Sequence, residues 1–177
     1  MCDTSNPKQA EALQFVEPGL SAIDKYSNRE DGIFVDIGPD HGLFSLYGAK
    51  KFKRVVALEL QQESVKQLSS NCKDNTDECN ILIVSSFVED LLTFFVHSNV
   101  NPKEITLFRI SYYGKEEFVL PDIFRIWKEY DMTGTLMVTF NINEWENKNL
   151  GRFDFFTKEQ VEILKMNPVG TTLLFFE

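Results

Sequence analysis

The chain has 177 residues, and its 18 basic and 27 acidic side chains give it a formal net charge of −9 at neutral pH. Hydrophobic residues make up 43% of the chain and charged residues 25%, as in globular domains and unlike disordered segments. The acidic balance disfavours a nucleic-acid-binding surface, and no apolar run approaches the roughly 18 residues that a membrane-spanning helix needs. We expect one domain over residues 1–177, with an N-terminal helical segment (1–30) and an α/β core (31–177).

The N-terminal segment is predicted to be helical. Residues 8–26 follow the helix-start signal Pro7 and can form one helix that is broken near Pro18 and Gly19. Residues 1–14 lack the apolar stretch of a secretory signal. Three cysteines occur in the chain, Cys2, Cys72 and Cys79. Because their number is odd and their spacing wide, they fit neither a disulfide framework nor a zinc site. We expect free thiols, no metal and a cytoplasmic location.

Five short runs rich in β-branched and aromatic residues predict strands that are buried on both faces. They cover residues 33–37, 54–58, 81–84, 105–110 and 135–140. The stretches between them have helical periodicity, most clearly over residues 43–51, 61–72, 87–97 and 116–130. Strands that alternate with helices predict a Rossmann-like, doubly wound and mostly parallel sheet with right-handed crossovers.

The C-terminal part of the core follows a different pattern. Thr157 can cap a helix, with Gln160 three residues later as its capping-box partner, and this helix continues through Ile163 and Leu164. Residues 171–176 form one last strand, which must lie in the sheet or at its edge to satisfy its backbone hydrogen bonds.

The stretch FVDIGPDHG, residues 34–42, lies between the first predicted strand and the next predicted helix. Gly38 and Gly42 allow a tight turn and a close approach of backbone to a ligand. The second strand then ends just before Glu59, an acid placed to accept hydrogen bonds from the hydroxyls of a ribose. This pattern favours the binding of an adenosine-containing ligand; the alternative is a purely steric glycine turn beside a surface glutamate.

The charges in the loop favour one kind of adenosine ligand. A dinucleotide site normally has the pattern G-x-G-x-x-G, whereas Asp40 occupies the position of the second glycine here. A carboxylate repels a pyrophosphate but attracts a ligand with an ammonium and a sulfonium group. Asp36 and Asp40 therefore favour S-adenosylmethionine over NAD. Each also has a structural reading: Asp36 can orient or cap the turn, and Asp40 can cap the helix after it.

The sequence resembles the class I S-adenosylmethionine-dependent methyltransferases, and within them the FkbM-like group. The resemblance lies in VDIGPDHGLFSLYGAKKF, in VVALELQQESVKQLSSN and, less specifically, in FRISYYGKEEFVL. It implies a seven-stranded sheet that closes with an antiparallel pair, of which we expect one strand to be missing here, and S-adenosylmethionine as cofactor. It also implies methyl transfer to an oxygen or nitrogen of a small molecule. The residues that it places around the cofactor are Asp36, Gly38, Pro39, Asp40, Gly42, Glu59, Leu60, Ser86 and Phe87.

Two catalytic candidates follow, each with a structural alternative. His41 lies in the loop, and histidine is the usual general base of enzymes, so His41 can accept a proton from a substrate hydroxyl, or it can merely hydrogen-bond to backbone. Glu116 matches an acid of the family pattern, but acids also stabilise the first turn of any helix. Ser86 can read the adenine or cap a helix with Glu89.

Other positions depart from the family or remain open. The fourth strand of the family ends in two acids, for which this chain has Ser111 and Tyr113. The missing acids make a degenerate, non-catalytic binding or interaction module the alternative function. Asn141 and the residues after it can shape an acceptor pocket or form a polar loop. Phenylalanines near the C-terminal end suggest a protein partner or a homodimer.

Overall fold

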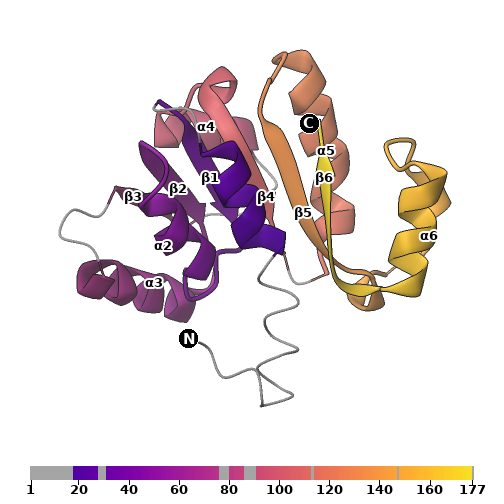
Figure 1. The fold of residues 1–177 in the computed structure, drawn as a ribbon, viewed down its shortest axis with the longest axis horizontal. Coiled ribbons are helices and arrows are strands. Elements are labelled where there is room, and N and C mark those ends of the chain that lie inside the picture. The colour runs from indigo at the N-terminus through magenta and orange to yellow at the C-terminus, as the bar shows by residue number, and fades with distance from the viewer. Residues whose placement is uncertain are drawn as a thin grey trace.

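The computed structural model describes residues 18–27, 31–75, 80–85, 91–112, 114–146 and 148–176. One sheet crosses the molecule in the strand order β3-β2-β1-β4-β5-β6 (Figure 1). The first five strands pair in parallel, and β6 pairs antiparallel with β5. The strands are β1 (Ile33–Ile37), β2 (Arg54–Leu58), β3 (Ile81–Val84), β4 (Ile105–Ile110), β5 (Thr135–Asn141) and β6 (Val169–Phe175).

Helices connect the strands and cover both faces of the sheet. They are α2 (Leu43–Ala49), α3 (Gln62–Asn75), α4 (Leu91–Ser98), α5 (Glu116–Glu129) and α6 (Lys158–Met166). Residues 18–26 form a further helix, and short 3₁₀ turns occupy Pro102–Glu104, Ile142–Glu144 and Leu150–Arg152. The predicted alternation of strand and helix is confirmed, as is the capping box at Thr157 and Gln160. The fold is therefore the predicted Rossmann-like α/β sheet, with one antiparallel strand after β5.

The alternation of side chains along each strand divides the core into two layers. Val35 and Phe108 face a cluster that α4 and α5 cover, whereas Phe34 and Leu107 face a cluster with residues 22–26 and α2. Asp36 lies two residues after Phe34, and Arg109 lies two residues after Leu107. Because side chains alternate along a strand, the side chains of Asp36 and Arg109 also lie on the α2 face. The strands of the core thus place one acid and one base together inside the protein.

Two further findings concern the cysteines and the length of the helices. Cys72 is disulfide-bonded, which corrects the expectation of free thiols. Disulfides are typical of oxidising compartments, so the cysteines give no support for a reducing one. No helix among the described residues is both long and apolar enough to cross a bilayer.

Candidate functional site

The loop between β1 and α2 owes its shape to three residues with positive φ. Gly38, Asp40 and Gly42 have φ angles of 71°, 53° and 93°. A Cβ atom on Gly38 would lie only 1.9 Å from the carbonyl oxygen of Ser111, and one on Gly42 would lie 2.2 Å from a methyl carbon of Leu68. Both positions need glycine, because a side chain would be strained and would meet neighbouring atoms. The loop is therefore pressed against the end of β4 and against α3.

The predicted cap of α2 by Asp40 is wrong. The helix begins at Leu43 with Gly42 as its N-cap, and no side chain caps it. Because the backbone of Asp40 has a left-handed conformation, the right-handed helix starts only after two more residues. Its carboxylate instead accepts a weak hydrogen bond from Ser64, at 3.4 Å. The Asp40 side chain is about half exposed, and His41 lies 3.6 Å from it.

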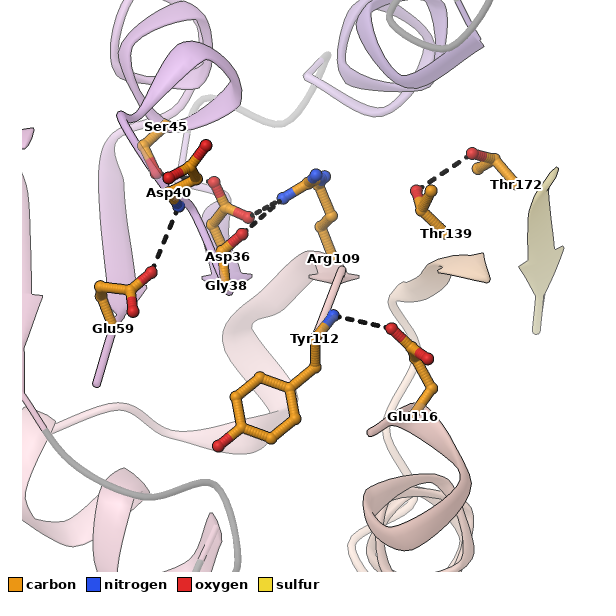
Figure 2. Close-up of polar contacts among 10 residues, drawn as sticks. All are labelled: Asp36, Gly38, Asp40, Ser45, Glu59, Arg109, Tyr112, Glu116, Thr139 and Thr172. Atoms are coloured by element: carbon orange, nitrogen blue, oxygen red, sulfur yellow. Dashed lines mark hydrogen bonds and ion pairs between the residues drawn. The ribbon is translucent and has the colours of Figure 1, made fainter. Parts of the chain in front are cut away.

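Asp36 is fully buried and both of its carboxylate oxygens have partners (Figure 2). Oδ2 accepts a hydrogen bond of 2.7 Å from the Ser45 hydroxyl of α2. Oδ1 accepts one of 2.7 Å from Nη1 of Arg109, the residue beside Asp36 in the parallel pairing of β1 and β4. The same Nη1 reaches the carbonyl oxygen of Gly38 at 3.5 Å. Asp36 therefore joins β1, α2 and β4 beneath the glycine loop and is closed to any ligand.

Glu59 lies at the end of β2 and holds the other side of the loop. Its Oε2 accepts a hydrogen bond from the Asp40 amide at 3.3 Å, and its Oε1 accepts one from the Gln61 amide at 2.8 Å. The side chain is 4% exposed. A carboxylate has about four acceptor positions, so two hydrogen bonds leave room for two more donors. The structure brings Glu59 to the loop as predicted, but Asp36 and Glu59 point to different partners and do not face one common crevice.

A pocket of about 340 Å³ opens beside the loop, on the side of α2 and β4. Its lining residues are Gly38, Pro39, Asp40, His41, Leu43, Phe44, Arg109 and Ser111. The His41 side chain is 70% exposed, so it can meet a molecule that enters from solvent. The guanidinium carbon of Arg109 lies 4.0 Å from the centre of the Phe44 ring, which fixes the plane of the guanidinium.

Glu116 binds loops of its own chain. Its Oε1 accepts a hydrogen bond from the Tyr112 amide at 2.9 Å (Figure 2). Oε1 also accepts one from the Gly114 amide at 3.2 Å, and Oε2 accepts one from the indole of Trp145 at 3.1 Å. The side chain is 1% exposed. Its neighbour Glu117 is also buried and pairs with Arg152. Together the two acids tie the start of α5 to the loops that follow β4 and β5, which is a structural role.

The remaining predicted positions are placed as follows. Leu60 is half-buried directly after Glu59, and the backbone of Ser111 forms part of the pocket. Asn141 ends β5, where its buried Oδ1 has no hydrogen-bond partner among the described residues. Ser86, Phe87, Glu89 and Tyr113 lie outside the described residues.

The sequence interpretation missed Arg109. The available signal was a charge inside the otherwise apolar run ITLFRI. A cation in a strand that is buried on both faces must find an anion. Asp36 is the acid with the matching position in a neighbouring strand.

No protein-family model matches the chain, and a search of curated proteins finds no match. Solved structures do match. An rRNA methylase from Streptococcus thermophilus is 17% identical with a TM-score of 0.56, over 83% of this chain and 77% of that one. The O-methyltransferase TomG from Streptomyces achromogenes, in complex with SAM, is 12% identical with a TM-score of 0.60, over 94% and 76% of the two chains. An O-methyltransferase from Bacillus cereus, in complex with SAH, is 13% identical with a TM-score of 0.60, over 86% and 70%. The chain thus has the fold of class I methyltransferases.

Proposed function

We propose that the chain binds S-adenosylmethionine at the β1–α2 loop and transfers its methyl group to an oxygen or nitrogen of a small molecule. The observation that carries this proposal is the contact between Glu59 and the Asp40 amide, which puts a carboxylate with spare acceptor positions on one side of the glycine loop, while the pocket opens on its other side. Two of the similar solved structures are of O-methyltransferases in complex with SAM or SAH. The loop pattern and the strand end before Glu59 keep the FkbM-like group as the proposed subgroup.

The residues divide into those that hold the loop and those that can touch a ligand. Asp36 acts through the loop, because protein donors use both of its oxygens. Glu116 acts in the same way through the loop after β4. We assign the ribose hydroxyls to Glu59 and the contacts of the methionine part to Gly38, Pro39 and the backbone near Ser111.

Methyl transfer from a sulfonium depends mainly on placing donor and acceptor in contact, since the leaving group is already activated. The fold supplies this by holding the loop rigidly from two sides. His41 is the proposed acceptor of the substrate proton, because it lines the pocket and remains open to solvent. A small-molecule acceptor agrees with the net charge of −9, which opposes binding to a nucleic acid.

Isothermal titration with S-adenosylmethionine, S-adenosylhomocysteine and NAD tests the proposal. We expect the first two ligands to bind, and Glu59→Gln to weaken both by about tenfold or more, as expected for the loss of a charged hydrogen-bond acceptor. The matched control is Glu63→Gln, since the Glu63 side chain is 90% exposed on α3. A preference for NAD would overturn the proposal. If none of the three ligands binds, the fold serves as a non-catalytic interaction module.

A further inference from the structure

Arg109 has a hydrogen-bonding edge whose Nε no described residue uses. A guanidinium offers two pairs of donors: one formed by Nη1 and Nη2, and one formed by Nε and Nη2. The hydrogen bonds of Arg109 to described residues, to Asp36 Oδ1 and to Gly38 O, both come from Nη1. Its Nε is buried and has no partner among the described residues, although the side chain is only 7% exposed.

The surrounding contacts hold this edge in one orientation. The Phe44 ring packs against the face of the guanidinium at 4.0 Å, and Asp36 fixes its rotation within that plane. Asp36 is itself held by Ser45. Arg109 lines the pocket beside the glycine loop, and its buried Nε places a pre-oriented donor group just beneath the pocket wall.

A carboxylate matches this group. The planar fork of an arginine binds a carboxylate through two parallel N–H···O bonds, and a buried donor without an acceptor is costly until an acceptor arrives. Asp36 and Asp40 add negative charge around the site, which disfavours a ligand that is only anionic. A carboxylate that is accompanied by a cationic group fits this balance of charges.

We infer that Arg109 receives the carboxylate of a ligand in this pocket through its Nε edge. The inference rests on the proposed function in so far as the carboxylate can belong to the amino-acid end of the methyl donor; it can also belong to the acceptor. In both cases Arg109 determines which ligands the pocket accepts.

The first test follows the Nε–Hε signal of Arg109 in a ¹⁵N-correlated NMR spectrum of the wild-type chain, assigned by its loss in Arg109→Lys. The probes are S-adenosylhomocysteine, 5′-methylthioadenosine, which lacks the amino-acid group, and acetate. In parallel, titration calorimetry compares the wild type with Arg109→Lys, which keeps a cation for Asp36 but loses the planar fork. The matched control is Arg125→Lys, because Arg125 is an exposed arginine of α5.

For a donor carboxylate we expect S-adenosylhomocysteine to shift the signal and Arg109→Lys to weaken its binding about ten- to a hundredfold. Binding of 5′-methylthioadenosine should then be the same in both proteins. If acetate shifts the signal saturably and S-adenosylhomocysteine does not, the carboxylate belongs to the acceptor. If neither probe shifts the signal, the inference is overturned, even where S-adenosylhomocysteine binds and the proposed function stands. If acetate alone binds, the site stands and the proposed function fails.

Discussion

Asp36 and Arg109 depend on each other, because each would be a buried charge without the other. Their contact of 2.7 Å joins neighbouring strands below the glycine loop. Removing one partner of such a pair lowers the free energy of unfolding strongly, since the remaining charge stays desolvated. Replacing both partners with apolar residues costs far less. The pair therefore fixes the position of the loop more than it raises the overall stability.

We predict that Asp36→Asn lowers the free energy of unfolding by about 3–5 kcal/mol, the usual cost of leaving a buried charge unpaired. The control Asp31→Asn alters an aspartate whose side chain is 90% exposed, and it should change stability by less than about 0.5 kcal/mol. Urea denaturation of the three proteins measures both values. Equal stabilities of Asp36→Asn and Asp31→Asn would contradict the assigned role of the pair.

Gly38→Ala tests the strain in the loop. Gly38 has a φ of 71°, and a Cβ atom at this position would lie 1.9 Å from the Ser111 carbonyl oxygen. An alanine therefore forces the loop away from β4. We expect a loss of at least about 2 kcal/mol in the free energy of unfolding, together with weaker binding of S-adenosylhomocysteine. Gly151→Ala is the matched control, because its Cβ would meet only a side-chain oxygen at 3.3 Å. A stable Gly38→Ala protein with unchanged affinity would show that the loop can adapt.

At the scale of elements, most strands were predictable because burial on both faces leaves near-continuous apolar runs such as IFVDI and RVVAL. The predicted burial of β3 on both faces is wrong, because β3 is an edge strand whose residues are only partly buried or exposed. The capping box of α6 was also predictable, because it depends on two residues close in sequence. The start of α2 was not. Its N-cap at Gly42 depends on the packing of the loop against Leu68 and Ser111, which lie far away in the sequence. The role of Glu116 likewise depends on Trp145 of another loop.

The helix over residues 18–26 is tied to α2 by a surface cluster that gives it a pH dependence. The Lys51 ammonium, together with the Tyr47 hydroxyl, lowers the pKa of Asp24 below its ordinary value of 3.8. The hydrogen bond to Asp24 in turn raises the pKa of Lys51 above 10.5 and that of Tyr47 above 10.0. The stabilisation from Asp24 is therefore complete above pH 3.8 and is lost as the pH falls through the folded-state pKa. The contributions of Lys51 and Tyr47 are present below pH 10 and are lost on the alkaline side.

We predict that Asp24→Asn lowers the melting temperature slightly, by the same amount from about pH 5 to pH 9, because all three groups keep their charge states over this range. The difference from the wild type should shrink toward zero as the pH falls below 3.8 and through the lowered folded-state pKa, since Asp24 is then protonated in both states of the wild-type chain. Thermal unfolding at a series of pH values measures it. A difference that does not shrink in acid would mean that the contact to Lys51 and Tyr47 does not stabilise the folded chain.

At the scale of the whole molecule, the candidate site is assembled from the ends of three strands that are adjacent in space and distant in sequence. The strand order places β1 between β2 and β4, so that Glu59, the glycine loop and Arg109 become neighbours. The sequence predicted the first two, because strand ends of a parallel sheet meet at one edge. It did not show which acid remains free for a ligand, since this depends on the partners that each carboxylate finds in the folded chain.

A ligand that bridges these strands should stabilise the entire fold. At a concentration of one hundred times its dissociation constant, a ligand that binds only the folded state raises the free energy of unfolding by about 2.7 kcal/mol. For a chain of this length we expect S-adenosylhomocysteine to raise the melting temperature by about 5–10 °C, and NAD at the same concentration to leave it unchanged. Glu59→Gln should reduce the rise at a fixed ligand concentration, whereas Glu63→Gln should not. Thermal scans over a range of ligand concentrations measure these shifts. If S-adenosylhomocysteine raises the melting temperature of Glu59→Gln as much as that of the wild type, the ligand does not contact Glu59, and its site lies elsewhere on the molecule.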